Sequence, residues 1–280
     1  MHGVTIEIAR AAHSSAGGTG YITPLAEGMS SQAWVGAIAG RESVIRTPVP
    51  GTKRPDPDYR SEANLNAALR AAGVPATDMR VVEIDGVLCS IAPRVLGEPI
   101  RPHQWSDSFV TDLATALAAT HSIPVDGHRL PTSVRRFHLA RIWPLDGTSL
   151  DDHPVRTEIP GLVDVARSKE RAIRAEAARA PRVVHSDLHW DHLIRSTSGR
   201  LAGILDFGDA FAGPPAWDFA CLRYYHGDEV GQRVAAAYPN GATIHRRSLP
   251  LGIAFALYKL DKTPHRADVI ERVEHLIRAA

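Results

Sequence analysis

The sequence predicts an α+β protein, with antiparallel strands gathered near the N-terminus and helices forming most of the remainder. Residues 22–48 contain short runs of apolar or alternating apolar and polar residues, separated by glycine turns. Similar runs over 81–92 predict a β-hairpin. After residue 100 helical patterns prevail, and a dense polar loop interrupts them at 185–192. A chain of 280 residues can bury a sizeable core, either as one two-lobed domain or as two small ones.

Composition narrows the classes of function. The formal net charge of +1 gives no reason to expect a nucleic acid or an acidic membrane as partner. Cys89 and Cys221 lie in apolar runs and are expected to be buried free thiols, which suits a reducing compartment. We see no signal-peptide pattern and no apolar run near the ~20 residues that span a bilayer. We therefore expect a cytoplasmic location.

The N-terminal third contains the strand patterns. Residues 1–20 are ambiguous, because 5–8 fit either a strand or the start of a helix. Strands are expected at 22–25, 32–39, 43–46, 81–84 and 87–92. The Asp85-Gly86 turn joins the last two strands as a clear hairpin.

One helix is expected among these strands, over residues 58–72. Asp56 or Asp58 can cap its N-terminus, and a glycine and a proline lie just beyond its C-terminus. Leu65 and Leu69 give it an apolar stripe at the spacing of one helical turn.

Helical patterns account for most of the chain after residue 100. Helices are expected over 106–120, 160–180, about 216–227, about 228–237, about 245–260 and about 265–279. The stretch 125–158 is rich in Pro, Gly and Asp and is expected to be a loop-rich insertion anchored by Trp143.

The polar loop at 185–192 contains the densest group of chemically active side chains. Two acidic residues and two imidazoles lie within six positions: Asp187, His189, Asp191 and His192. Two short strands joined by a turn would place this loop beside Asp206. Burying so many polar groups is costly without a partner, so a metal ion, a phosphate or a hydroxyl substrate is expected there.

The spacing of these residues resembles that of the aminoglycoside, macrolide and choline phosphotransferases, which share the protein-kinase fold. His185 and Asp187 match the start of the family's His-x-Asp-x-x-x-x-Asn loop, and His192 stands where Asn is usual. The macrolide kinases are similar in carrying His at that position. Asp206-Phe207-Gly208 matches the Asp-Phe-Gly-like motif, and Trp217-Asp218-Phe219 resembles the stretch that opens the next helix.

The resemblance implies a protein-kinase-like fold with two lobes. Residues 1–92 would form a nucleotide-covering N-lobe, with a small antiparallel sheet and one helix. Residues 93–100 would be the hinge. Residues 101–280 would form a mainly helical C-lobe that carries the catalytic loop and the substrate site.

The resemblance also implies ATP or GTP between the lobes. The turn containing Gly28, Ser30 and Ser31 would close on the phosphates, because main-chain N–H groups and small hydroxyls approach them without obstruction. The same residues are common in ordinary hairpins, which leaves a structural role open. Ala92 would begin the hinge, whose backbone meets the base.

Arg46 lies where the kinase pattern has its phosphate-binding lysine, and Glu62 lies where it has the helix glutamate. Arginine keeps the charge and can bind both a phosphate and a carboxylate, so an Arg46–Glu62 ion pair is expected. A solvated strand-end arginine and a glutamate that only favours the helix dipole are the alternatives. Lys53 is a less favoured substitute for Arg46.

In this scheme Asp187 orients the acceptor hydroxyl and accepts its proton. His192 and Asp206 would hold the divalent ion, Mg²⁺ or Mn²⁺. Mg²⁺ prefers oxygen ligands, so His192 could instead act through water, favour Mn²⁺, or only orient Asp187. The candidates for substrate binding are Asp209, His189 and Asp191. The residues expected to be structural are His121, His185 and Asp218.

The residues of the polar loop also fit a second class of enzyme. Residues 187–192 are close to the zinc motif of metallo-β-lactamase-like hydrolases, with Asp187 in place of the first histidine ligand. Placement favours the kinase, because the zinc motif should lie early in the chain and here Asp206 follows within 14 residues. A non-catalytic kinase-like binding protein is a third reading.

The expected function is nucleotide-dependent phosphorylation of a hydroxyl on a small molecule. An antibiotic is the favoured acceptor, namely a cyclic peptide of the viomycin and capreomycin type, an aminoglycoside or a macrolide, so that the enzyme would confer resistance. A small-metabolite kinase of the choline or homoserine type is the alternative. The oligomeric state is left open.

Overall fold

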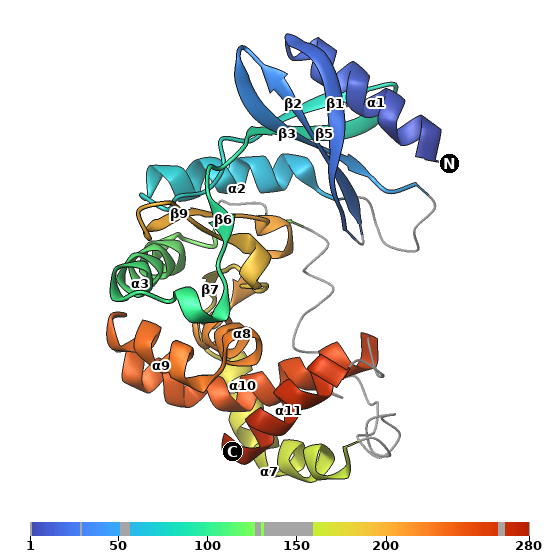
Figure 1. Ribbon diagram of the computed structural model, residues 1–280. Coiled ribbons are helices and arrows are strands. Elements are labelled where there is room, and N and C mark those ends of the chain that lie inside the picture. The colour runs from blue at the N-terminus through green and yellow to red at the C-terminus, as the bar shows by residue number, and fades with distance from the viewer. Residues whose placement is uncertain are drawn as a thin grey trace.

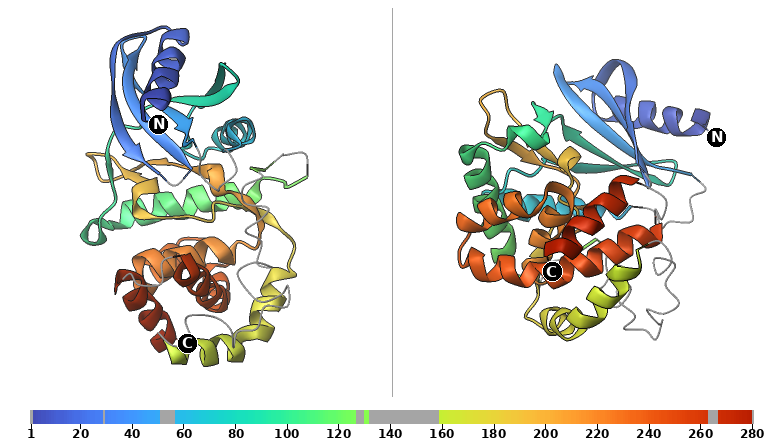
Figure 2. Two further views of the ribbon diagram at one scale, coloured as in Figure 1. Left: turned by 90° about the vertical axis from the view of Figure 1, so that its right-hand side faces the viewer. Right: turned by 60° about the horizontal axis from the view of Figure 1, so that its bottom comes forward.

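The computed structural model describes residues 2–28, 30–50, 57–126, 130–131, 159–262 and 267–279. Figure 1 shows a sheet-containing N-terminal part above a mainly helical part, with the two termini in different parts. The left view of Figure 2 shows the same division from the side. Lys53 and Trp143 lie outside the described residues, as does most of the expected insertion at 125–158.

The N-terminal part is built on one antiparallel sheet of five strands in the order β1-β2-β3-β5-β4. Its strands are β1 (Gly18–Glu27), β2 (Ser31–Ile38), β3 (Arg41–Pro48), β4 (Arg80–Ile84) and β5 (Val87–Pro93). Asp85 and Gly86 have φ values of 50° and 79°, as a tight turn matched to the strand twist requires. The expected strands are therefore present, and β1 is longer than predicted.

A helix covers this sheet that the sequence did not clearly predict. Helix α1 (His2–Ser15) packs Ala9 and Ala12 against the sheet, so the described residues of the range 1–92 contain two helices instead of the expected one. Its His13 is buried, with Nε2 2.8 Å from the Ala37 carbonyl oxygen. A Cβ at Gly36 would lie 2.8 Å from that imidazole, so the close approach of helix and sheet requires glycine.

Helix α2 (Tyr59–Ala71) forms where it was expected. The Asp58 carboxylate accepts a hydrogen bond from the Ser61 N–H at 3.0 Å, which confirms the predicted cap. Leu65 and Leu69 are buried in the hydrophobic cluster of the helical part, not in that of the sheet. Helix α2 therefore connects the two parts (Figure 1).

The chain passes between the two parts after β5. It forms the short strand β6 (Glu98–Pro99), which pairs with β8 (Leu193–Arg195), and β8 pairs with β9 (Leu201–Ile204). Gly97 has φ 136°, and a Cβ there would lie 2.3 Å from the Arg195 carbonyl oxygen. The hinge boundaries at 93 and 100 stay predictions.

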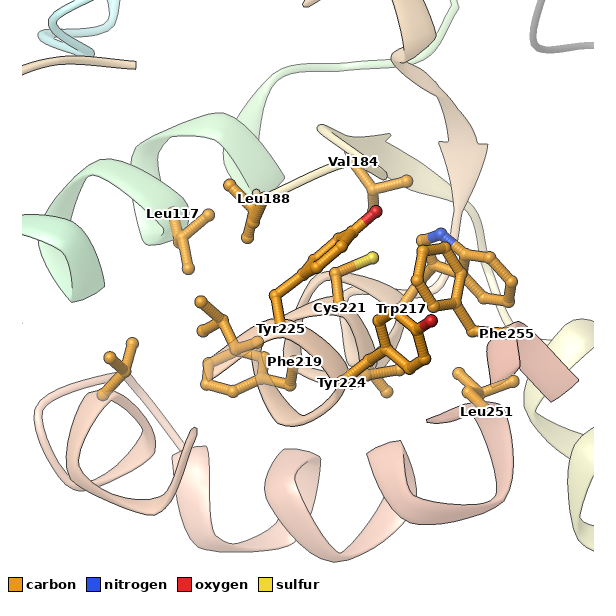
Figure 3. Packing of buried hydrophobic residues seen from close by; sticks show 14 of the residues in the cluster. Leu117, Val184, Leu188, Trp217, Phe219, Cys221, Tyr224, Tyr225, Leu251 and Phe255 are labelled. Atoms are coloured by element: carbon orange, nitrogen blue, oxygen red, sulfur yellow. The ribbon is translucent and has the colours of Figure 1, made fainter. Parts of the chain in front are cut away.

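The helical part has the expected helices, with ends shifted by a few residues. They are α3 (Asp107–Ser122), α7 (Pro160–Ala177), α8 (Ala216–His226), α9 (Asp228–Ala236), α10 (Gly241–Lys262) and α11 (Ala267–Ala279). Helix α8 lies in the middle and is buried along nearly its whole length. Figure 3 shows its aromatic side chains packed beside Leu251 and Phe255 of α10. No helix in the described ranges is long and apolar enough to cross a membrane.

Two short strands bracket the polar loop. Strand β7 (Arg182–Val184) leads into it and pairs antiparallel with β10 (Phe211–Gly213), a pairing that the sequence did not predict. The segment 185–210 thus leaves and returns at the same place in the fold. The expected hairpin of β8 and β9 lies inside this segment and brings residue 206 back to the loop.

Candidate active site

The main chain of the polar loop is held by hydrogen bonds to a fully buried carboxylate. Asp218 on α8 accepts hydrogen bonds from the main-chain N–H groups of His185, at 3.0 Å, and Ser186, at 2.8 Å. His121 Nε2 lies 2.9 Å from the same carboxylate. Burial would raise the pKa of Asp218, but these bonds and the imidazole lower it below its ordinary value. The structural roles expected for Asp218 and His121 are confirmed.

His185 joins the loop to the end of β9. Its Nε2–H donates to the Leu205 carbonyl at 2.8 Å, and its Nδ1 accepts from the Asp187 N–H at 3.2 Å. Burial lowers the pKa of His185, which matches a neutral ring with one donor and one acceptor. The Leu205 N–H also donates to the His192 carbonyl at 2.8 Å. This confirms that His185 is structural and explains why Asp206 lies beside the loop.

Asp187 and Asp206 converge on the two sides of one imidazole. His192 Nδ1 donates to the Asp187 carbonyl at 2.7 Å and lies 3.7 Å from Asp187 Oδ2. Its Nε2 lies 3.6 Å from Asp206 Oδ2. Burial would lower the pKa of His192, but the carboxylates of Asp206 and Asp187 raise it above its ordinary value. The convergence expected from the sequence is present.

The backbone at Asp206 is in the left-handed region, with φ 60° and ψ 63°. A residue other than glycine adopts it at a cost, and such strain recurs where a side chain must be aimed. Phe207 is buried against the His185 ring, whereas the Asp206 side chain is 41% exposed. Burial acts to raise the pKa of Asp206, and the charges of Arg46 and His192 lower it.

Arg46 links the sheet, helix α2 and Asp206, which lies beside the polar loop. Its Nη1 donates to Glu62 Oε1 at 2.8 Å, and its Nη2 donates to Asp206 Oδ1 at 3.2 Å. The ion pair predicted between Arg46 and Glu62 is therefore present. Glu62 is only 2% exposed, and burial raises its pKa while Arg46 lowers it. Its Oε2 has no hydrogen-bond partner among the described residues.

The residues expected around a nucleotide occupy the N-terminal part. The Gly28 N–H donates to the Ser31 carbonyl at 2.8 Å, and the Val49 N–H donates to the Ser30 carbonyl at 3.1 Å, so the turn is closed by its own backbone. Ala92 lies in β5 and pairs with Val44 of β3. The roles of Gly28, Ser30, Ser31 and Ala92 toward phosphate and base stay predictions.

Two residues that the sequence did not single out contact Asp187. The Tyr225 hydroxyl donates to Asp187 Oδ1 at 2.7 Å, and Lys259 Nζ lies 3.5 Å from the same oxygen. Burial would raise the pKa of Asp187, but Lys259, His192 and the Tyr225 bond lower it to about 2. Tyr225 lies on α8, 38 residues after Asp187, and Lys259 lies on α10, 72 residues after it. No local spacing in the sequence indicates either residue.

The three candidates for substrate binding lie around this site. His189 has its ring against Tyr225, at 4.8 Å between centroids, and burial lowers its pKa to about 4. Asp191 is exposed, with Oδ2 3.3 Å from His189 Nδ1. Partial desolvation and the carboxylates of Asp206 and Asp187 raise the pKa of Asp209 to about 7. The Asp209 side chain reaches solvent.

The donor set suits a hard divalent ion that keeps water and substrate oxygens as ligands. His192 Nδ1 is committed to a carbonyl, so Nε2 faces the half-exposed Asp206 carboxylate. Within the described ranges, no group of three or more His, Cys, Asp or Glu side chains is arranged to hold a metal ion. A zinc hydrolase needs three or more protein ligands, whereas Mg²⁺ between phosphates takes one or two. The pair of His192 and Asp206 side chains matches the smaller of these two ligand numbers.

Solved structures with the same fold include phosphotransferases for several small molecules. The ADP-bound aminoglycoside phosphotransferase APH(2'')-Ib is 21% identical, with TM-score 0.64 over 97% of this chain and 96% of that one. Macrolide 2'-phosphotransferase type I is 20% identical, with TM-score 0.64 over 99% and 97%. Choline kinase LicA from Streptococcus pneumoniae is 14% identical, with TM-score 0.68 over 99% and 98%. These similarities confirm the kinase-like α+β fold.

In sequence, no curated protein matches the chain. The model of the phosphotransferase enzyme family matches residues 22–251, which include the sheet, the polar loop and the central helices. The protein therefore belongs to the phosphotransferase enzyme family.

Proposed function

We propose that the protein transfers the γ-phosphoryl group of ATP or GTP to a hydroxyl of a small molecule. The observation that carries this proposal is the convergence of Asp187 and Asp206 on His192, with Arg46 bridging Asp206 and the buried Glu62. Phosphoryl transfer depends on alignment and on cations that absorb charge, and this arrangement offers both.

Asp187 is assigned to the acceptor hydroxyl. Its carboxylate is ionised at neutral pH, because its pKa is lowered to about 2, so it can accept a hydrogen bond from the hydroxyl and orient the oxygen for attack. The buried Asp218 beneath the loop holds the main chain on which Asp187 is carried.

Asp206 and His192 are assigned to the divalent ion, Mg²⁺ or Mn²⁺. When bound, the ion would neutralise charge on the nucleotide phosphates. Asp206 offers its half-exposed carboxylate and His192 offers Nε2, either directly or through water. Arg46 would contact the phosphates, with the turn of Gly28, Ser30 and Ser31 above them and the hinge from Ala92 against the base.

The acceptor is proposed to be an antibiotic: a cyclic peptide of the viomycin and capreomycin type, an aminoglycoside or a macrolide. Asp209, His189 and Asp191 would contact it, and resistance would follow. The similarity to a choline kinase supports a second candidate, a small-metabolite kinase of the choline or homoserine type. The buried free thiols of Cys89 and Cys221 support a cytoplasmic location.

A coupled nucleotide-consumption screen tests the function. The purified protein is assayed with ATP and GTP, with Mg²⁺ and Mn²⁺, against a panel of the three antibiotic classes, choline and homoserine. We expect one class to raise consumption above the acceptor-free rate, and the Asp187→Asn protein to lose that increase. No metal-dependent nucleotide binding, and no acceptor-dependent consumption, would refute the proposal.

A further inference from the structure

We propose that Lys259 and Tyr225 are positioning residues of the transfer reaction. They hold Oδ1 of Asp187, so that Oδ2 is the oxygen that meets the acceptor hydroxyl. This inference rests on the proposed function and adds two residues that neither the motif spacing nor the family match assigns. Its geometric basis is the unequal surroundings of the two carboxylate oxygens.

Oδ1 of Asp187 is held by two groups from the helical core. The Tyr225 hydroxyl donates to it at 2.7 Å, and Lys259 Nζ lies 3.5 Å away. A short bond to a neutral donor fixes direction, and the ammonium adds an attraction that does not depend on one hydrogen position. Together they restrict the rotation of the carboxylate about its terminal torsion, which is otherwise broad.

Both groups are themselves held in place by packing. Tyr225 is 8% exposed, and Figure 3 shows its ring among the buried side chains of α8. Lys259 Nζ lies 5.3 Å from the centroid of the Tyr225 ring and 5.0 Å from that of Phe255, one turn earlier on α10. Cations are attracted to the faces of such rings, which favours the position of the ammonium beside the Asp187 carboxylate.

Oδ2 has different surroundings. It faces His192, whose Nδ1 is 3.7 Å away and already donates to the Asp187 carbonyl at 2.7 Å. On the far side of that ring lies Asp206, at 3.6 Å from Nε2. Oδ2 is thus the oxygen on the side assigned to the metal and the phosphates.

The different surroundings of Oδ1 and Oδ2 determine which oxygen of Asp187 accepts the proton of the acceptor hydroxyl. The acceptor hydroxyl gives its proton to Oδ2 as its oxygen forms a bond to the γ-phosphorus. The bond from that phosphorus to the bridging oxygen breaks, and the electron pair leaves with the nucleoside diphosphate. The Lys259 ammonium offsets the repulsion between the Asp187 carboxylate and the phosphoryl oxygens.

The test compares Lys259→Met and Tyr225→Phe with matched controls. Arg246→Met removes a cation from an exposed position of the same helix α10, and Tyr224→Phe removes a hydroxyl from the neighbouring buried ring of α8. Thermal unfolding establishes that each variant is folded. The readouts are kcat and the KM values for nucleotide and acceptor.

We expect Lys259→Met to lower kcat roughly 10- to 100-fold and Tyr225→Phe roughly tenfold, with the nucleotide KM changed less than about twofold. Lys259→Arg should restore most of the loss, and both controls should keep wild-type kcat. On an Asp187→Asn background, Lys259→Met should add less than about twofold, because the two residues act as a unit.

Two results would overturn the inference: a Lys259→Met protein with wild-type kcat, or an equal loss with and without the Asp187 carboxylate. Either result is compatible with an active wild-type enzyme, so neither result would refute the proposed function. A wild-type protein that transfers phosphate to no acceptor refutes the function itself, and the inference with it.

Discussion

At the scale of single residues, the electrostatics of the site depend on two carboxylates and the imidazole between them. His192 lies between Asp187 and Asp206, and their charges raise its pKa although burial acts against it. In its protonated form, the ring would stabilise both carboxylates. A metal ion would need the neutral ring, so the residues that raise the pKa of His192 also make the metal compete with a proton.

Replacing Asp187 by Asn should lower kcat by roughly 100-fold or more, because the amide cannot accept the proton of the hydroxyl. Nucleotide affinity should stay within about twofold. Steady-state kinetics and nucleotide titration measure the two effects. Unchanged turnover would remove the assignment of Asp187 to the acceptor.

Replacing Asp206 by Ala should abolish metal-dependent nucleotide binding, because it removes the exposed oxygen ligand of the pair. Titration of a fluorescent nucleotide with and without Mg²⁺ measures this. Asp191→Ala, which removes an exposed carboxylate from the same loop, is the control. If the Asp206→Ala protein still requires Mg²⁺ for tight nucleotide binding, the metal lies elsewhere.

At the scale of elements, helix α2 belongs by sequence to the sheet but packs by Leu65 and Leu69 into the helical core. Glu62 on the same helix faces Arg46 of β3, which also reaches Asp206. The Arg46 side chain thus joins a strand, a helix and the residue that follows β9 beside the polar loop. The position of α2 therefore sets the position of the Arg46 cation next to Asp206, the proposed metal ligand.

Arg46→Met should destabilise the fold by about 3 kcal/mol, because it leaves Glu62 buried without its partner. Arg46→Met combined with Glu62→Gln should recover part of that loss, since the buried charge is gone. Urea unfolding of both variants at pH 7 measures the difference. A single variant as stable as wild type would show that solvent, not Arg46, stabilises the glutamate.

At the scale of the whole molecule, the polar loop joins the two halves of the fold. It is carried on Asp218 of the central helix α8, and Arg46 from the sheet reaches its neighbour Asp206. Strand β6 and helix α2 provide the further connections between the halves. Loss of Asp218 should therefore affect the stability of the helical part and not only the site.

Stability should fall in acid partly through Asp218. Its pKa in the folded protein is below the ordinary value of 3.8, so its contribution is complete above that pH and is lost as the pH falls through the folded value. Asp218→Asn should cost about 3 kcal/mol at pH 7, with the gap to wild type narrowing below pH 4. Urea unfolding between pH 7 and pH 3 measures the gap. A constant gap would show that the charge is not the cause.

What could be predicted from the sequence was local. The polar loop and Asp206 were identified because their spacing along the chain is the pattern itself, and Asp58 caps α2 within one turn. Helix α1 was ambiguous, because its helical state depends on packing Ala9 and Ala12 against a sheet formed by later residues. The same distance in sequence hid the pairing of β7 with β10.

By itself, then, the sequence indicated the residues proposed to carry the chemistry and determined the family to which the chain belongs. Only the tertiary structure decided how Asp187 is held, because Tyr225 and Lys259 come from helices that reach the loop through the packing of α8 and α10. The physical reason is that a motif encodes short-range spacing, whereas the orientation of a carboxylate depends on atoms brought together by burial.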